Sequence, residues 1–309
     1  MNMIYGQPYS RPSRASQDKA QQTIGAGAIA GYVNRALLTE VMLTPKPGLV
    51  DARNCGAHYD MDINTFLASA RAIAPWWPRF LEMGHESAGI AAHLSLPLVR
   101  PIGLQCEQAM LQATHGINTH KGAIFSFGLL CFAAGRLLTN GFDLTRESMC
   151  AEVAGICSGL VDRELRGTLE AGTAGERAFR RFGFPGARGE AASGFATVRT
   201  TALPVYDGLR FDGVSEEVAL LQALLHLLAV NDDTNLVSRG GLAGLGYVRT
   251  YATKLLQAGG ALAPDGAAKM AAFDDALIRR HLSPGGTADL LGLTWFIAQF
   301  PAVNEDARI

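Results

Sequence analysis

The stretch GINTHKG (residues 116–122) is followed at once by the apolar run AIFSFGLLCFAAGRLL (residues 123–138). A run that is apolar on nearly all sides is typical of a buried helix. Asn118 or Thr119 is a suitable N-cap for it. The free N–H groups at a helix start attract anions, and a histidine and a lysine stand at the same place. The stretch predicts a central helix with either a polar site or, more simply, a capped start with a solvated lysine.

Apolar residues recur at helical spacing on both sides of this stretch. The N-terminal pattern has to end near Thr44, because Pro45 and Pro47 cannot continue a helix. No alternating run is long enough to predict a sheet. The glycine-rich segment 172–190 is predicted to be a long loop with at most a short helical piece. Helical patterns cover residues 24–41, 63–73, 101–115, 142–163, 214–230, 248–256, 267–281 and 287–299.

The predicted fold class is therefore all-α, with roughly ten or more helices given ordinary helix lengths. We expect a single multi-helix domain over residues 23–309, preceded by a loose polar tail over residues 1–22. Polar residues cluster wherever one helix ends and the next begins. If the helices run up and down in a bundle, these loops gather at one end and form one pocket.

Composition narrows the class of protein. Of 309 residues, 48% are hydrophobic and 18% are charged, as in a folded globular protein. The net charge of −1 gives no reason to expect a nucleic-acid partner. The tail lacks the apolar segment of a signal sequence, and the run 123–138 is too short to span a membrane. The five cysteines have no zinc-site spacing, so we expect a reduced cytoplasmic protein without a membrane partner.

The loops carry two kinds of charged residue. Lysine and arginine side chains bind phosphates. The candidates for this role are Lys46, Lys121, Arg188 and Arg239. Carboxylates suit Mg²⁺ or proton transfer, and they are Glu40, Asp51, Glu190, Asp232 and Asp233. Asp60 or Asp62 is expected to cap the helix that follows. The glycine-rich segment 240–246 is interpreted as a loop, and because it follows no strand it is neither a Rossmann nor a Walker motif.

Six polar blocks occur in the order TPKPGLVD (44–51), NCGAHYDM (54–61), GINTHKG (116–122), GARGEA (186–191), NDDTN with SRGG (231–241) and SPGGTADLL (283–291). Together they resemble the triphosphoribosyl-dephospho-CoA synthase family over residues 37–300. The segments RPIG (100–103) and LVDREL (160–165) favour the branch that serves citrate lyase over the branch that serves malonate decarboxylase.

The resemblance implies a reaction in which ATP gives its triphosphoribosyl group to the 2′-hydroxyl of 3′-dephospho-CoA and adenine leaves. The product would pass to a holo-acyl-carrier synthase. The family's α linkage, formed from a β-nucleoside, fits one displacement with inversion at the ribose C1. An oxocarbenium-like state of this kind needs a base on the incoming hydroxyl and a proton donor to the leaving adenine.

The resemblance also implies that residues of the six blocks form a nucleotide-binding pocket, and it implies a role for each. The base would be His120, Asp51 or Glu190, which the sequence does not rank. Mg²⁺ would be bound by Asp232 and Asp233, with Glu190 as a further candidate. The phosphates of the two substrates would be held by Lys46, Lys121, Arg188 and Arg239. Further substrate-binding residues from the same blocks are His58, Asn118, Thr119, Asn235 and Ser283.

Two other functions compete with this one. A helical Mg²⁺-dependent hydrolase of nucleotides or ADP-ribosyl groups would also need acidic residues around a metal. It would proceed with water alone, whereas a transferase needs dephospho-CoA. A non-catalytic helical subunit that binds an acyl-carrier partner would instead show apolar anchors on exposed helices, and the clusters of charged residues with glycine argue against it.

Overall fold

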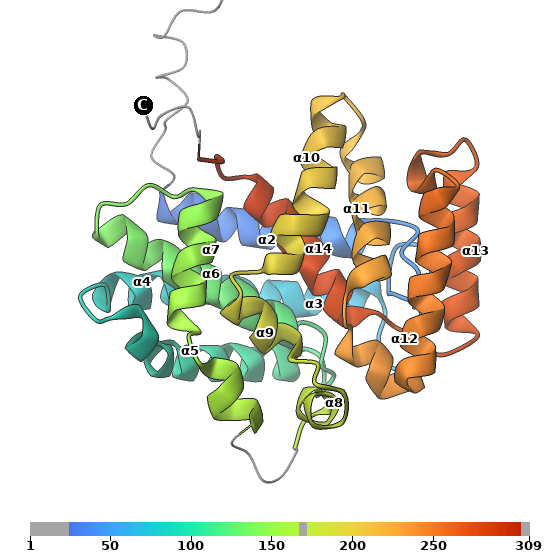
Figure 1. Ribbon diagram of the computed structural model, residues 1–309. Coiled ribbons are helices and arrows are strands. Elements are labelled where there is room, and N and C mark those ends of the chain that lie inside the picture. Colours follow the sequence, from blue (N-terminus) through green and yellow to red (C-terminus); the bar gives the residue numbers. More distant parts are fainter. Residues whose placement is uncertain (1–24, 167–171, 304–309) are drawn as a thin grey trace, which may run out of the picture.

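The computed structural model describes residues 25–166 and 172–303 (Figure 1). All regular structure in these two ranges is helical, which confirms the predicted all-α class; the predicted tail lies outside them. The longer helices are α2 (Ala26–Met42), α3 (Ile63–Ile73), α4 (Trp77–Glu86), α5 (Ala92–Ala113), α6 (Lys121–Thr139), α7 (Arg146–Ile156), α8 (Ala174–Phe182), α9 (Gly186–Ala192), α10 (Leu203–Phe211), α11 (Glu216–Val230), α12 (Thr234–Gln257), α13 (Gly266–Ile278) and α14 (Gly285–Ala298). Short helical turns are Ala74–Trp76, Asp162–Arg166, Val198–Ala202 and Gly260–Leu262.

Helix α6 is the buried centre predicted from its sequence. It packs against α4, α5, α7 and α14, and one hydrophobic cluster extends from Ile29 in α2 to Phe300 after α14. Figure 1 shows α6 and α14 inside the shell made by the other helices. Among the described residues, α6 alone is long and apolar enough to cross a membrane, but 78% of its most apolar window is buried. Such burial is typical of the core helix of a globular fold.

Glycines let α4 and α6 approach closely. A Cβ on Gly84 would lie 2.1 Å from the backbone oxygen of Phe132, and one on Gly135 would lie 2.0 Å from that of Leu81. Any larger residue at either position would force the two helices apart. This contact fixes one side of the central helix.

Two predicted helix boundaries and one predicted loop are wrong. Helix α5 begins at Ala92 and contains Pro97 and Pro101, because its apolar face continues through both prolines and packs on α3, α6 and α7. The segment 142–163 is not one helix, since α7 ends at Ile156. The glycine-rich segment 240–246 lies within α12, where Gly241 (φ 61°) makes a kink instead of a loop.

The predicted loop 172–190 contains helix α8 and the start of α9. Thr173 and Glu176 form a capping box at the start of α8, and Gly183 ends it in the left-handed conformation (φ 77°). These are ordinary start and stop signals, which the many glycines obscured. The predicted cap of α3 is confirmed, because the side chain of Asp62 accepts the N–H of Thr65.

Candidate active site

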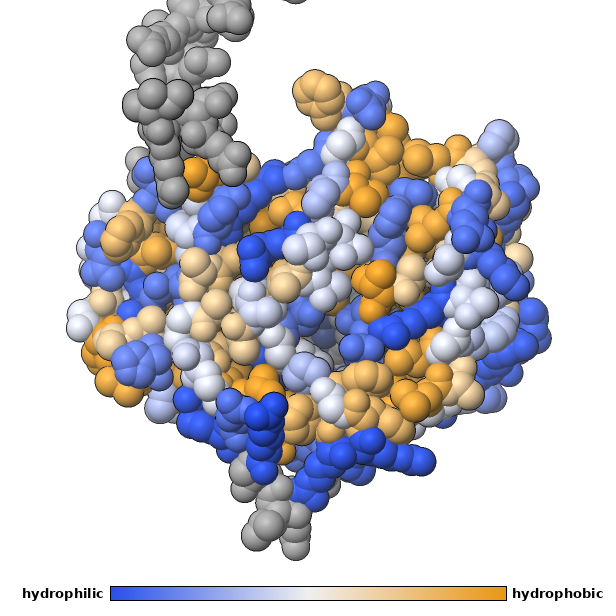
Figure 2. Space-filling view, viewed as in Figure 1, coloured by the Kyte–Doolittle hydropathy of each residue, from blue (hydrophilic) through white to orange (hydrophobic). Residues whose placement is uncertain are grey.

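The polar loops surround one cavity of about 430 Å³. Its walls come from the end of α2, the loop that follows it, and the starts of α6, α9, α12 and α14. Figure 2 shows a hollow near the middle of the same face as Figure 1, bordered by hydrophilic and intermediate residues. The volume is in the range of small-molecule sites.

Most of the predicted site residues line this cavity. They are Lys46, His58, Asn118, Thr119, His120, Lys121, Glu190, Asp232, Asp233, Asn235, Arg239 and Ser283. Asp51 and Arg188 do not line it. Residues from all six sequence blocks are therefore brought together, although the blocks are spread over most of the chain.

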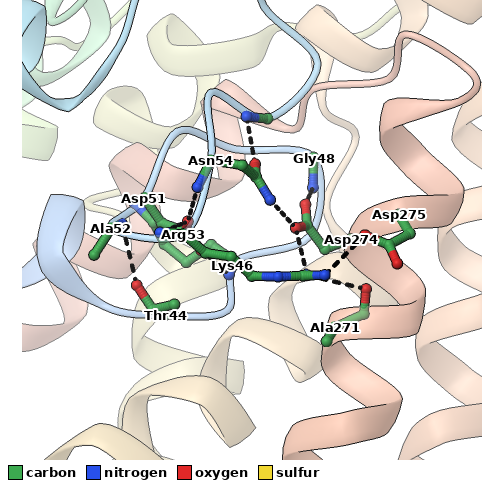
Figure 3. A network of polar contacts seen from close by, with 11 residues as sticks. Thr44, Lys46, Gly48, Asp51, Ala52, Arg53, Asn54, Ala271, Asp274 and Asp275 are labelled. Carbon is green, nitrogen blue, oxygen red and sulfur yellow. Dashed lines mark hydrogen bonds and ion pairs between the residues drawn. The ribbon is translucent and has the colours of Figure 1, made fainter.

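Asp51 holds the loop that bears Lys46 (Figure 3). One carboxylate oxygen accepts the N–H of Lys46 at 2.8 Å. The other accepts the N–H groups of Arg53 at 2.7 Å and Asn54 at 3.1 Å. The side chain is 2% exposed. The carboxylate of Asp51 thus accepts hydrogen bonds from backbone N–H groups and does not line the cavity. Its position does not fit the predicted role as the catalytic base.

A second buried carboxylate, Asp274 of α13, anchors the same loop, and sequence reasoning missed it. Its oxygens accept the N–H of Gly48 at 2.9 Å, the side-chain amide of Asn54 at 2.7 Å and the guanidinium of Arg53 at 3.1 Å (Figure 3). Burial raises the pKa of Asp274 above its usual range. An acidic residue on an otherwise apolar helix face was the available signal.

Lys46 lies beneath the cavity rather than at its mouth. It is 1% exposed, and its Nζ is 2.5 Å from Oε1 of Glu40, which is 11% exposed. Such a buried pair stabilises the fold only while both partners are present. Any phosphate that binds Lys46 therefore also meets the Glu40 carboxylate.

The start of α6 differs from the prediction. The N-cap residue is His120, whose side chain makes no capping bond. Asn118 still contributes, because its Oδ1 accepts the N–H of Lys121 at 3.2 Å. The Lys121 side chain is 55% exposed and pairs with Glu107 at 2.9 Å.

His120 is 4% exposed, and its Nδ1 lies 2.6 Å from Oγ of Ser69 in α3. Its Nε2 has no hydrogen-bond partner among the described residues. Burial, and secondarily the charge of Lys46, lower the pKa of His120 to about 3. The ring is therefore neutral near neutral pH.

Glu190 is placed on the cavity by α9. Its oxygens accept the hydroxyl of Thr197 at 2.5 Å and the N–H of the same residue at 3.3 Å. Burial raises the pKa of Glu190 above its usual range, against the effect of these bonds. Because Ala187 and Glu190 are three residues apart, they share a helix face. Arg188 points elsewhere and pairs with Glu164 at 2.9 Å and Glu176 at 3.3 Å.

Asp232 and Asp233 have different surroundings. Asp233 caps α12 by accepting the N–H groups of Asn235 and Leu236, and it also accepts both the N–H and the hydroxyl of Thr287. Burial raises its pKa. Asp232 pairs with Arg249 at 2.7 Å. The described part of the chain contains no group of three or more histidine, cysteine, aspartate or glutamate side chains placed to hold a metal.

His58, Arg239 and Ser283 join three segments at the rim. The guanidinium of Arg239 lies 3.2 Å from Nδ1 of His58, and Nε2 of His58 lies 2.9 Å from Oγ of Ser283. Burial, followed by the charge of Arg239, lowers the pKa of His58. Arg239 also donates to the backbone oxygen of Ala57 at 3.0 Å.

Known proteins are similar to this chain over about nine-tenths of its length. A family model described as ATP:dephospho-CoA triphosphoribosyl transferase (CitG) matches residues 26–307. The chain belongs to this family. A relative from Klebsiella pneumoniae, named 2-(5''-triphosphoribosyl)-3'-dephosphocoenzyme-A synthase, is 54% identical over 90% of this chain and 93% of its own. One from Escherichia fergusonii with the same name is 51% identical over 91% and 94%. No solved structure was found to match the chain.

In this member of the triphosphoribosyl transferase family, sequence reasoning missed Asp289 of α14. Its carboxylate lines the cavity and makes no hydrogen bond or ion pair with the described residues. Burial, with the nearby charges of Glu40 and Asp233, raises its pKa well above the usual range. The block SPGGTADLL contained the signal, because an aspartate in an otherwise apolar helix needs a reason to be there.

Proposed function

We propose that the protein transfers the triphosphoribosyl group of ATP to the 2′-hydroxyl of 3′-dephospho-CoA and releases adenine. One observation carries this proposal: each of the six sequence blocks contributes at least one charged residue to a single cavity, in a chain that is 54% identical to a relative named for this product. Gathered lysine and arginine suit two phosphate-bearing substrates.

The reaction is a displacement at the ribose C1. The 2′-oxygen of dephospho-CoA forms a bond to C1 while the bond from C1 to adenine breaks. The electron pair of the broken bond leaves with adenine, which takes up a proton, and the hydroxyl proton goes to a base. Glu190 is the base that fits best, because it lines the cavity and its raised pKa makes it a stronger proton acceptor than an ordinary carboxylate.

Phosphate binding is assigned to Lys46, Lys121 and Arg239, which line the cavity, and not to Arg188, which pairs with two glutamates away from it. The remaining polar wall is assigned to substrate hydroxyl, amide and base groups. Its residues are His58, Asn118, Thr119, Asn235 and Ser283.

Mg²⁺ fits part of the predicted site. Mg²⁺ in nucleotide enzymes is commonly bound through one or two carboxylates and the substrate phosphates. Asp233 does not fit as a ligand, because four hydrogen bonds already occupy its oxygens. Asp232 and Asp289 line the cavity and would hold the ion, which would offset the charge of the triphosphate.

The assigned pathway is the supply of the prosthetic-group precursor of citrate lyase, with malonate decarboxylase as the alternative. The product would be consumed by a holo-acyl-carrier synthase in the cytoplasm. RPIG and LVDREL, the segments that favour the citrate lyase branch, place Arg100 close to Glu164 as an ion pair. This contact lies outside the cavity, so the choice of pathway does not alter the chemistry proposed for the site.

The test is mass analysis of the products formed with ATP, Mg²⁺ and 3′-dephospho-CoA. We expect adenine and a product that carries the triphosphoribosyl group, both dependent on dephospho-CoA. Adenine or ADP-ribosyl cleavage with water alone would instead identify a hydrolase. If neither ATP nor dephospho-CoA raised the unfolding temperature, the non-catalytic function would be favoured.

A further inference from the structure

A short chain of hydrogen bonds links the imidazole of His120 to the hydroxyl groups of Ser69 and Thr119. Oγ1 of Thr119 donates to Oγ of Ser69 at 2.7 Å, and Oγ of Ser69 lies 2.6 Å from Nδ1 of His120. Ser69 is completely buried in α3, and His120 stands at the start of α6. The edge-on ring of Phe66, with its centroid 5.1 Å from that of His120, covers the imidazole.

The direction of these bonds decides which imidazole nitrogen carries the proton. Ser69 has one hydroxyl proton, and it accepts the proton of Thr119. Within the described chain its only other partner is Nδ1 of His120, so Ser69 donates there. A neutral imidazole that accepts at Nδ1 carries its proton at Nε2. The reverse direction would leave two groups without a partner in the same part of the chain, the hydroxyl proton of Thr119 and the lone pair of Nε2, whereas the direction assigned leaves only Nε2–H.

We propose that His120 serves the cavity as a neutral hydrogen-bond donor through Nε2–H, and that Ser69 and Thr119 are positioning residues that fix this tautomer. The nitrogen is buried and has no partner among the described residues, and His120 is one of the residues that line the cavity. Buried polar groups without a partner are rare in native proteins, and such a donor in a cavity wall is available for a ligand.

This assignment changes the role that the sequence left open for His120. A general base needs a nitrogen lone pair that faces the substrate, but here the lone pair is at Nδ1 and is used by Ser69. An imidazolium is excluded near neutral pH by burial and by Lys46, which lower the pKa. Only a donor role remains.

The acceptor follows from the proposed function, on which this step rests. A neutral N–H favours an atom of ATP that holds or gains negative charge. Two such atoms are a ring nitrogen of the departing adenine, which receives the electron pair of the broken bond, and a phosphate oxygen. In both cases the proton stays on His120, and the hydrogen bond alone stabilises the acceptor.

The tautomer can be tested without any catalysis, by ¹⁵N NMR of the free full-length protein labelled at histidine. We expect a protonated Nε2 and an unprotonated Nδ1 for His120, unchanged between about pH 6 and 9. The His120→Gln variant identifies the signal by its absence. Ser69→Ala should mix the tautomers, and Ser69→Thr, which keeps the hydroxyl, should restore the single one. A ring protonated at Nδ1 would overturn the proposal.

Kinetics of two substitutions test the donor role. Glutamine retains an N–H near the position of Nε2 but cannot act as a base, whereas alanine provides neither group. We expect His120→Gln to keep at least about tenfold more activity than His120→Ala. Equal and complete loss in both variants, with each folded by circular dichroism, would indicate a base and overturn the proposal.

Binding of inorganic triphosphate, measured by calorimetry, separates the two acceptors. If a phosphate oxygen is the acceptor, His120→Ala weakens triphosphate binding. If adenine is the acceptor, that binding is unchanged and kcat falls. An Ala variant with unchanged binding and unchanged kcat would contradict any donor role. Should the wild-type protein release no adenine at all, the proposed function fails, while NMR still decides the tautomer.

Discussion

The carboxylate of Asp289 lies directly against the backbone of Gly122. A Cβ on residue 122 would stand 2.0 Å from Oδ2 of Asp289, far inside contact distance. The first turn of α6 and the first turns of α14 therefore meet around an acidic side chain that faces the cavity. Any residue larger than glycine at position 122 would have to displace this carboxylate.

Replacing Gly122 by alanine should displace Asp289 and damage the site more than the fold. We expect kcat to fall by about 10- to 100-fold, since misplacement by about 1 Å has effects of that size. Steady-state adenine release measures it. The matched control is Gly31→Ala in α2, where nothing lies within 4 Å of the new Cβ. A Gly122→Ala enzyme with normal kcat would show that the position of Asp289 is unimportant.

Lys46→Met should destabilise the protein as well as impair ATP use. It leaves the Glu40 carboxylate buried without its partner, and breaking such a pair lowers the free energy of unfolding by about 3–5 kcal/mol. Chemical denaturation measures this loss. The double variant Lys46→Met with Glu40→Gln removes the unpaired charge and should recover part of it. A Lys46→Met protein as stable as wild type would mean that Lys46 serves phosphate alone.

Asp51→Asn should act on stability through the loop after α2. An amide can replace only one of the two carboxylate oxygens, so at least one of the three backbone N–H groups loses its acceptor, at a cost of about 1–3 kcal/mol. Chemical denaturation of the variant is the measurement. If the variant were as stable as wild type but had no activity, Asp51 would again be a candidate for the catalytic base.

The sequence was enough to predict the helical class and the central helix. A uniformly apolar run such as α6 has to be buried. The prolines after α2 cannot continue a helix, so α2 has to end before them. Boundaries that depend on tertiary packing were not predictable in this way. Helix α5 runs through two prolines, and α12 through the kink at Gly241, because the faces they bury outweigh the local signals.

For the site, the sequence blocks identified the correct loops but not the direction of each side chain. Arg188 and Glu190 are two residues apart on α9, and only the glutamate lines the cavity. Asp51 and Asp274 are carboxylates of the kind that act as catalytic acids or bases, but in this structure they hold the loop after α2 in place. Ser69 carried no signal, since one serine in an amphipathic helix is ordinary. Which neighbour a polar group meets is decided by packing between distant segments.

The base role of Glu190 predicts an acidic limb in the pH–rate profile. Burial raises its pKa, so the ionised form is lost already as pH falls through a value above the usual carboxyl range, and kcat/KM falls with it. In Glu190→Gln this limb should vanish with most of the activity.

The raised pKa of Glu190 has the opposite effect on stability. Because the ionised carboxylate is disfavoured in the folded state, the free energy of unfolding decreases as pH rises from the pKa of Glu190 in the unfolded chain to its higher pKa in the folded protein. Glu190→Gln should therefore be at least as stable as wild type near neutral pH.

The last prediction separates transfer at the ribose from chemistry at phosphorus. If C1 is the electrophile, the bonds between the phosphates of ATP survive, and the triphosphate only has to be held. An ATP analogue with nitrogen or carbon between the β and γ phosphorus atoms should then still release adenine, more slowly if its contacts with Lys46, Lys121 and Arg239 are poorer.

A kinase or ATPase must break that same bond, so the analogue would block it. Chromatography of the bases and nucleotides after incubation with the analogue, Mg²⁺ and dephospho-CoA distinguishes the two reactions. Reactions without dephospho-CoA serve as the control, because transfer requires the acceptor hydroxyl. If the analogue gave no adenine while ATP gave ADP and phosphate, the three basic residues would still be phosphate ligands, but the reacting atom would be phosphorus and the base role proposed for Glu190 would not hold.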